Sequence, residues 1–229
     1  MHQLPYLFLL LLTAATLFGA DKAAEPLARL DEAAAVFQEI MGVSDKAIPQ
    51  DLLDKSHCIV IVPSLKKGAF IVGAKYGKGF LSCRKPGAGW SAPGTVRVEG
   101  GSVGLQIGGS ESDVIMLVMN ERGAAKLLSS KFTLGGEGAV AAGPVGREAT
   151  AQTDVAMRAE ILSWSRARGV FAGISLQGAT LREDLDDNNT IYGKKYSNKD
   201  IVQQGIAVPN SAQKLISLLN KYSGVKNAN

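Results

Sequence analysis

Residues 66–84 read KKGAFIVGAKYGKGFLSCR, and this stretch decides the fold. Glycines separate short runs of strand-forming residues, a pattern typical of strands that turn often or approach one another closely. Two strands are expected here, Ala69–Ala74 and Gly79–Arg84, joined through residues 75–78. Twelve of the 26 glycines fall between Gly68 and Gly109, which extends the expectation of short strands beyond this stretch.

The strand pattern continues on both sides of this stretch. Cys58–Val62 is a continuous apolar run closed by Pro63, as expected of a strand that is buried on both faces. Alternating or apolar runs bounded by turn residues predict the remaining strands, which are Thr95–Glu99, Ser102–Ile107, Val114–Met119, Lys131–Leu134, Thr150–Met157, Glu160–Ser165, Gly169–Leu176 and Gly178–Leu181.

Helices are expected at both ends of the chain and near its centre. Glu25–Met41 repeats apolar residues at three- and four-residue spacing, and its acidic polar face favours packing on the core over insertion beside anionic lipid. Asn120 is a good N-cap for a helix over Glu121–Ser129. Ser197 and Asp200 form a capping-box pattern, and a last helix is expected from Ser211.

These elements predict an α+β fold with a largely antiparallel sheet as its core. Residues 25–222 are expected to form a single domain, followed by a polar tail over residues 223–229. The first twenty residues contain no Asp, Glu, Lys or Arg and carry an apolar run from Leu7 to Leu12. This pattern predicts a secretory signal peptide over residues 1–20 and a periplasmic or extracellular location, which includes association with a membrane there.

Cys58 and Cys83 are the only cysteines in the chain. In an exported protein they could form a disulfide. Two small buried thiols are an equally good interpretation, because free cysteine is often fully buried. Sequence alone leaves both alternatives open.

Motifs of known enzyme classes occur only in the wrong context. Gly100–Gly104 matches the nucleophile elbow of serine hydrolases, but no histidine follows Ser102. Ser64–Lys67 matches S-x-x-K without the later motifs of that class. His57 is the one histidine after the predicted signal, and no Cys and His residues have zinc-site spacing. The sequence therefore predicts neither catalysis nor an organic cofactor.

One acidic segment suggests calcium. Asp184, Asp186 and Asn188 stand at positions 1, 3 and 5 of a calcium-loop pattern. Lys195 occupies position 12, where such loops carry a bidentate Glu, and Asn189 replaces the glycine of position 6. A solvated acidic turn is the favoured alternative.

Positive charge is concentrated between Lys55 and Val98, which includes residues 66–84. Eight basic residues and no Asp or Glu lie between Lys55 and Val98, although the net charge is only +4. A surface of one sign attracts phosphate-bearing partners, and an anionic membrane is favoured over nucleic acid because aromatics for base stacking are few. The alternative is solvated lysine on an exposed sheet face. The candidate lipid contacts are Lys66, Lys67, Lys75, Lys78, Arg84, Phe70 and Tyr76.

Not all five cationic side chains can share one face, because side chains alternate along a strand. Lys66, Lys67, Lys75 and Lys78 lie in the expected turns. They are therefore predicted to be the most accessible of the set.

Several motifs in a fixed order resemble the SYLF (Ysc84-type) lipid-binding domain. The similar segments span about Ile48 to Gly193 and include Ile61–Pro63, Lys67–Gly73, Tyr76–Gly79, Ser82–Arg84, Trp90–Pro93, Gly104–Gly108, Lys131–Gly135, Ala142–Arg147 and Trp164–Gly173. The resemblance implies binding of phosphoinositides or other anionic lipids without catalysis. Eukaryotic members also bind actin filaments, so a protein filament or envelope partner is the second expectation. The signal-like start suggests a bacterial exported member, with a bacterial or host lipid as ligand.

Overall fold

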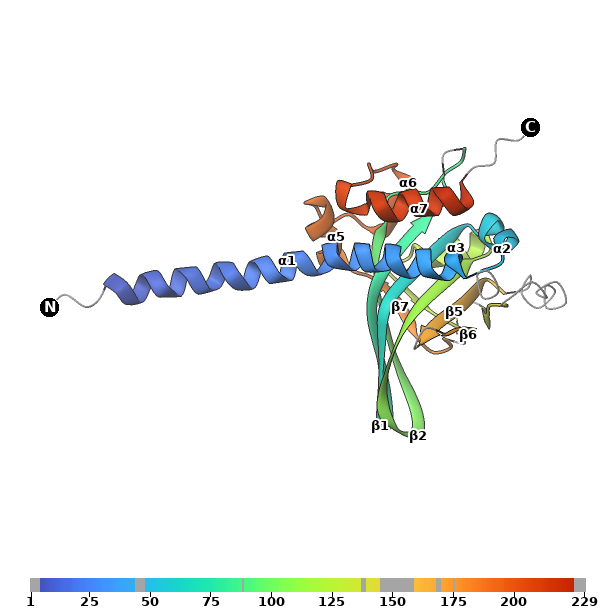
Figure 1. Cartoon of the computed structure of the whole chain (residues 1–229), viewed down its shortest axis with the longest axis horizontal. Coiled ribbons are helices and arrows are strands. Elements are labelled where there is room, and N and C mark those ends of the chain that lie inside the picture. The colour runs from blue at the N-terminus through green and yellow to red at the C-terminus, as the bar shows by residue number, and fades with distance from the viewer. Residues whose placement is uncertain are drawn as a thin grey trace.

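The computed structural model describes residues 5–43, 48–87, 89–136, 139–144, 159–167, 170–174 and 176–224, without the side chains of residues 5–22, 69–72, 102–108 and 171. The described residues form an α+β domain with one seven-stranded sheet (Figure 1). The sheet is antiparallel except where β4 (Val140–Ala142) pairs with β5 (Ile161–Ala167) in parallel. This architecture confirms the predicted fold class, with helices at both ends and one central helix.

Two long strands dominate the sheet. β1 (Cys58–Cys83) and β2 (Gly94–Val118) pair antiparallel along nearly their whole length. β1 merges three runs that the sequence assigned to separate strands. Its first run does not end at Pro63, because a bulge between Val62 and Leu65 absorbs that residue within the strand. Ser64 adopts a φ of 55° at this bulge, and its backbone N–H donates to Asp113.

The β1–β2 pair doubles back on itself, so the two ends of β1 meet. A Cβ at Gly79 would collide with the carbonyl oxygen of Ile61, which explains why glycine stands where the two arms of β1 pass each other. The middle of the pair projects from the body of the domain (Figure 1). We call this projecting part the ribbon and define it as residues 65–77 of β1 with residues 98–112 of β2.

The remaining strands attach to the ends of β2. β7 (Thr180–Glu183) pairs with Val96–Glu99 of β2 and with β3 (Lys131–Thr133) on its other side. β5 pairs with Asp113–Val118 and with β6 (Val170–Gly173). Within the described residues, Gly100–Ser112 of β2 therefore pairs with β1 alone. The predicted strand over Thr150–Met157 lies outside the described residues.

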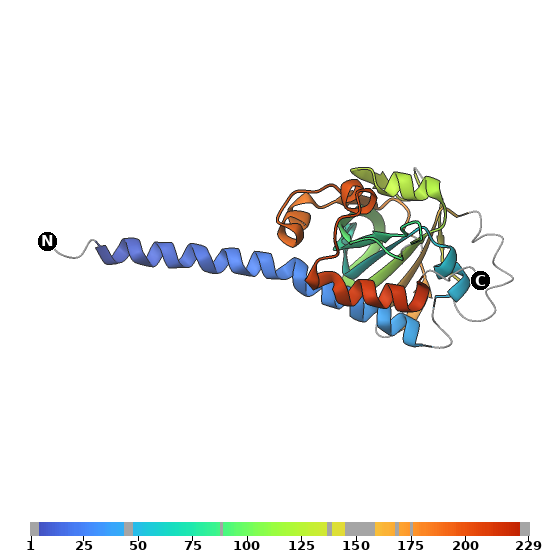
Figure 2. The same cartoon turned by 90° about the horizontal axis from the view of Figure 1, so that it is seen from above.

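Helices surround the sheet, and the described helical elements are α1 (Pro5–Gly42), α2 (Gln50–Lys55), α3 (Glu121–Leu127), α5 (Leu185–Tyr192), α6 (Asn198–Gln203), a 3-10 turn (Asn210–Ala212) and α7 (Gln213–Ser223). The predicted helix over Glu25–Met41 is the second half of α1, which lies beside α7 against the sheet (Figures 1 and 2). The first half of α1 extends away from the domain. Among the described residues, no helix combines the length and apolarity needed to cross a membrane.

Two apolar clusters fill the domain, one on each face of the sheet. Ile59 and Ile61 point into the first cluster, with Phe37 of α1 and Leu219 of α7. Their neighbours on β1, including Val60, point into the second cluster, which lies within the curled sheet. A strand buried on both faces explains the continuous apolar run over Cys58–Val62.

Candidate functional site

The basic residues of β1 fall into two groups that differ in what surrounds them. Lys78 belongs to the first group, near the body of the domain. Its Nζ lies 3.0 Å from Oδ2 of Asp184 and 2.9 Å from Oδ1 of Asp187. Burial alone would lower the pKa of Lys78, but its hydrogen bonds to Asp187 and Asp184 outweigh burial and raise that pKa. The prediction that Lys78 is an accessible turn lysine is therefore wrong.

Asp187 also holds helix α1 in place. Nη1 of Arg29 donates to Oδ2 of Asp187 at 2.8 Å, and both side chains are about nine-tenths buried. Asp187 thus bridges Lys78 of β1 and Arg29 of α1. The neighbouring Arg97 of β2 pairs with Glu99 at 2.6 Å. Acids from β2 and from the start of α5 therefore neutralise Lys78 and Arg97.

Arg84 is half-buried, and its guanidinium is engaged by other parts of the fold. Its guanidinium stacks over Trp90, with Cζ 4.5 Å from the ring centroid. It donates to the carbonyl oxygens of Ser56 and Leu53 at 2.8 and 2.9 Å, and to Ser223. Burial lowers the pKa of Arg84. These bonds tie the end of β1 to the ends of α2 and α7, so Arg84 has a structural role in the fold.

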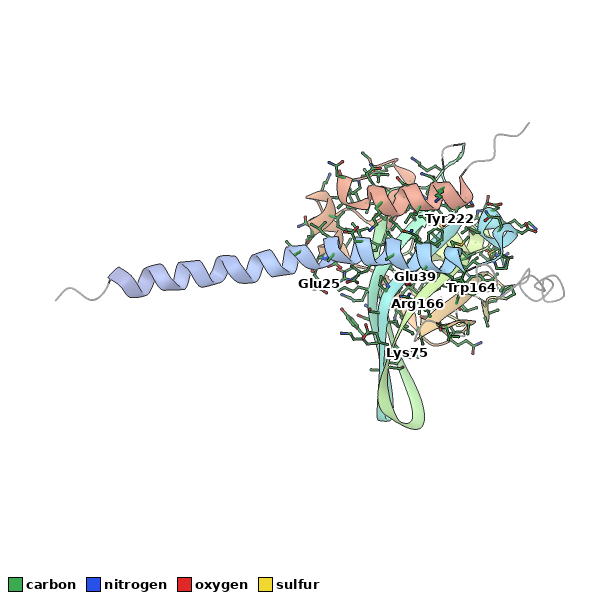
Figure 3. All side chains as sticks on the ribbon, viewed as in Figure 1. Glu25, Glu39, Lys75, Trp164, Arg166 and Tyr222 are labelled. Carbon is green, nitrogen blue, oxygen red and sulfur yellow. A yellow bond between two sulfur atoms is a disulfide. The ribbon has the colours of Figure 1, made fainter. Side chains whose placement is uncertain are left out.

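The second group lies on the ribbon and has a different environment. Lys66 is exposed and Lys67 and Lys75 are half-buried, and none of the three has an ion pair within the described part of the chain. Burial and the charge of Lys75 together lower the pKa of Lys67. Two like charges are thus held close to each other on the two arms of β1. Figure 3 shows Lys75 where the ribbon leaves the domain.

Tyr76 accompanies these lysines, with 48% of its surface exposed. The backbone of Phe70 lies in β1, but its side chain is outside the described residues. Across the ribbon, Glu111 is the strand partner of Lys66 and Glu99 that of Tyr76. Since Glu99 is engaged by Arg97 and Arg182, the ribbon keeps a local excess of positive charge.

The calcium hypothesis is wrong, because its loop is the helix α5. Asp184 is the N-cap of this helix and accepts from the backbone N–H of Asp187, while its other oxygen faces Lys78. The side-chain oxygen of Asn188 accepts from Thr95 at 2.8 and 2.9 Å, and Asp186 pairs with Lys195. The residues that the structure describes contain no group of three acidic, His or Cys side chains able to hold a metal.

The two cysteines form a disulfide, with an S–S distance of 2.05 Å. Cys58 and Cys83 are the first and last residues of β1. The bond therefore fastens the two ends of the doubled strand, and it selects the first of the two alternatives that the sequence left open.

Comparison with known proteins identifies relatives. Residues 99–222 match the family model Ysc84, described as "Las17-binding protein actin regulator". The SH3 domain-containing YSC84-like protein 1 of Xenopus laevis is 32% identical over 84% of this chain and 59% of its own length. The human protein of that name is 31% identical over 78% of this chain and 52% of its own length. Protein YSC84 of Saccharomyces cerevisiae is 30% identical over 77% and 38%, respectively.

The chain thus spans about half the length of the curated relatives that it matches. The segment that matches the family begins at Glu99 within β2 and ends at residue 222, within α7. The description of this family refers to a regulator of actin.

Proposed function

Because this chain belongs to the Ysc84 (SYLF) family, we propose that it is a non-enzymatic module that associates peripherally with anionic membranes. The ribbon supplies the contact, through Lys66, Lys67 and Lys75. Lys78 and Arg84, which the sequence had included, act in the fold instead. The observation that carries the proposal is the close pair formed by Lys67 and Lys75, which has no carboxylate partner among the described residues.

Physical chemistry supports an anionic partner for this pair. Two ammonium groups near each other repel, and an anion placed between them relieves that repulsion. Each lysine near an anionic bilayer contributes about 1 kcal/mol, so three give about 3 kcal/mol. Adsorption of this strength is weak and depends on salt, because ions screen exposed charges beyond about 10 Å at 0.1 M.

Vesicle flotation tests the proposal. We expect binding to vesicles of phosphatidylcholine that contain about 30% of the anionic lipid phosphatidylglycerol, and no binding to vesicles of phosphatidylcholine alone. The double variant Lys67→Glu/Lys75→Glu should abolish binding. Lys131→Glu/Lys199→Glu, with the same change in net charge at exposed sites on β3 and α6, should retain it. Binding to neutral vesicles, or binding that survives the ribbon reversal, would contradict the proposal.

A protein filament is the second candidate, favoured by the description of the matched family as a regulator of actin. The ribbon lysines would then meet an acidic protein surface. Co-sedimentation with actin filaments separates the two functions. If the partner is a filament, the protein should pellet with actin and should not bind anionic vesicles. Lys67→Glu/Lys75→Glu should then abolish the pelleting. From the signal-like pattern of residues 1–20, we further propose that this membrane contact is made in the periplasm or outside the cell.

A further inference from the structure

A cavity of about 430 Å³ opens beside the disulfide, at the ends of β1 and away from the ribbon. The Cys58–Cys83 pair lines it, together with Leu128, after α3, and Val202 of α6. His57 and Lys85 lie on either side of the two cysteines in sequence and also line it. Nothing in the family match or in the ribbon accounts for this cavity.

The polar side chains that line this cavity are those of His57, Arg84, Lys85 and Gln203. No acidic residue lines it. Among the described residues, no hydrogen bond or ion pair engages the imidazole of His57 or the ammonium of Lys85. Arg84 also lines the cavity and adds its positive charge, although its guanidinium already donates to carbonyl oxygens. The cavity therefore favours an anionic group, which could accept from both free side chains.

The local backbone holds these two side chains in place. The N–H of His57 donates to the carbonyl of Val118, and its carbonyl accepts from Arg84. Lys85 begins a tight loop, with its N–H donating to the carbonyl of Gly89 at 2.8 Å. Gly89 has a φ of 72°, a conformation in which glycine is unstrained. Lys85 thus stands on a short loop anchored at the end of β1.

Apart from Gln203, the rest of the lining carries no polar side chain. Pro86, Ala124, Leu128 and Val202 surround the disulfide, so a fully hydrated ion would leave most of the wall without a partner. A volume of 430 Å³ lies within the range of small-molecule sites and exceeds the need of a bare phosphate. A ligand that combines a charged head with a short hydrocarbon chain matches both parts of the lining.

We propose that this cavity binds a small anionic amphiphile. His57 and Lys85 hold its carboxylate or phosphate group, and Leu128 and Val202 contact its hydrocarbon chain. Fatty acids and lyso-phospholipids share this chemistry. The site is separate from the ribbon, so it does not rest on the proposed adsorption to membranes.

Calorimetric titration of the full chain tests the site, with octanoate, octyl phosphate, octanol and inorganic phosphate as probes. We expect octanoate or octyl phosphate to bind at least about tenfold more tightly than octanol and phosphate, and the tighter of the two identifies the head group. Equal binding of octanol, equal binding of inorganic phosphate, or no heat from either amphiphile at millimolar concentration would overturn the proposal.

Variants separate a site from non-specific adsorption. Lys85→Glu should weaken amphiphile binding about tenfold or more, and Val202→Trp should weaken it by filling the cavity. Lys131→Glu, which makes the same charge change at an exposed site on β3 that does not line the cavity, should leave binding unchanged. Melting temperatures identify variants that fail to fold. An effect of Lys131→Glu equal to that of Lys85→Glu, in folded proteins, would overturn the proposal.

Discussion

The two groups of basic residues on β1 have similar composition and opposite surroundings. Near the body, Lys78 lies within 3.0 Å of two carboxylates from residues more than a hundred positions away. On the ribbon, Lys67 has another lysine as its electrostatic neighbour, and the pKa of Lys67 is lowered. The pKa of Lys78 is raised. Charge counted along the sequence thus differs from charge available to a partner, because the fold brings acids to one group and not to the other.

The largest expected effect is on stability, from the group near the body. Asp187→Ala removes the buried carboxylate that Arg29 and Lys78 share, so both cations lose a partner. We expect the free energy of unfolding to fall by about 3 kcal/mol, as when one member of a buried ion pair is removed. Urea denaturation followed by circular dichroism measures the change.

The matched control for this variant is the adjacent residue. Asp186 is 85% exposed and pairs with Lys195. Asp186→Ala should therefore change the free energy of unfolding by less than about 1 kcal/mol. Similar losses from the two variants would show that the position of Asp187 between Arg29 and Lys78 has no special weight.

Removal of the disulfide should have an effect of comparable size. The bond closes a separation of 25 residues, which contains the β1 half of the ribbon. Cys58→Ala/Cys83→Ala is expected to lower the free energy of unfolding by about 3 kcal/mol, since the unfolded chain gains freedom. Reduction of the wild-type protein should give a similar loss in the same denaturation assay. A stable protein after both treatments would mean that the packing of β1 against itself suffices.

The smallest expected effect concerns the ribbon pair. Lys75→Met removes the neighbouring charge, so the pKa of Lys67 should rise toward its ordinary value and stop short of it because burial persists. NMR titration of labelled lysine side chains measures this shift, with Lys131→Met as the control that leaves it unchanged. An unaltered pKa of Lys67 in Lys75→Met would break the contrast between the two groups.

The same pair gives stability a pH dependence. The folded-state pKa of Lys67 lies below its value in the unfolded chain, so the folded state binds fewer protons between the two values. Its contribution to stability therefore improves as the pH rises through that interval, and Lys75→Met should make the improvement smaller.

Local patterns were enough to predict most elements of this fold. The cap at Asn120 and the capping box of Ser197 and Asp200 both form as expected, since they depend only on neighbours within one turn. The glycines around Gly79 were misassigned. They were interpreted as turns between strands, whereas they permit one long strand to pass close to itself. Such a contact joins distant segments and leaves no local signal.

The candidate site shows the same limit. The sequence predicted turns at the ribbon lysines, whereas β1 runs through them as one continuous strand. It also could not reveal that Asp184 and Asp187 lie beside Lys78. The acids were visible as a cluster, and their spacing suggested a calcium loop. Their spacing on a helix instead directs Asp184 and Asp187 toward β1, while Asp186 points to solvent. Arg29 carried no sequence signal that distinguished it from an ordinary surface residue.

Acetylation of lysine amines, followed by mass spectrometry with and without anionic vesicles, shows which lysines a membrane covers. We expect Lys66, Lys67 and Lys75 to react in the free protein and to become protected by vesicles containing phosphatidylglycerol. Lys78 should react slowly under both conditions, and exposed Lys199 should react equally in both. Rapid acetylation of Lys78 would contradict the contrast between the two groups. So would ribbon lysines that react equally with and without vesicles while Lys199 becomes protected.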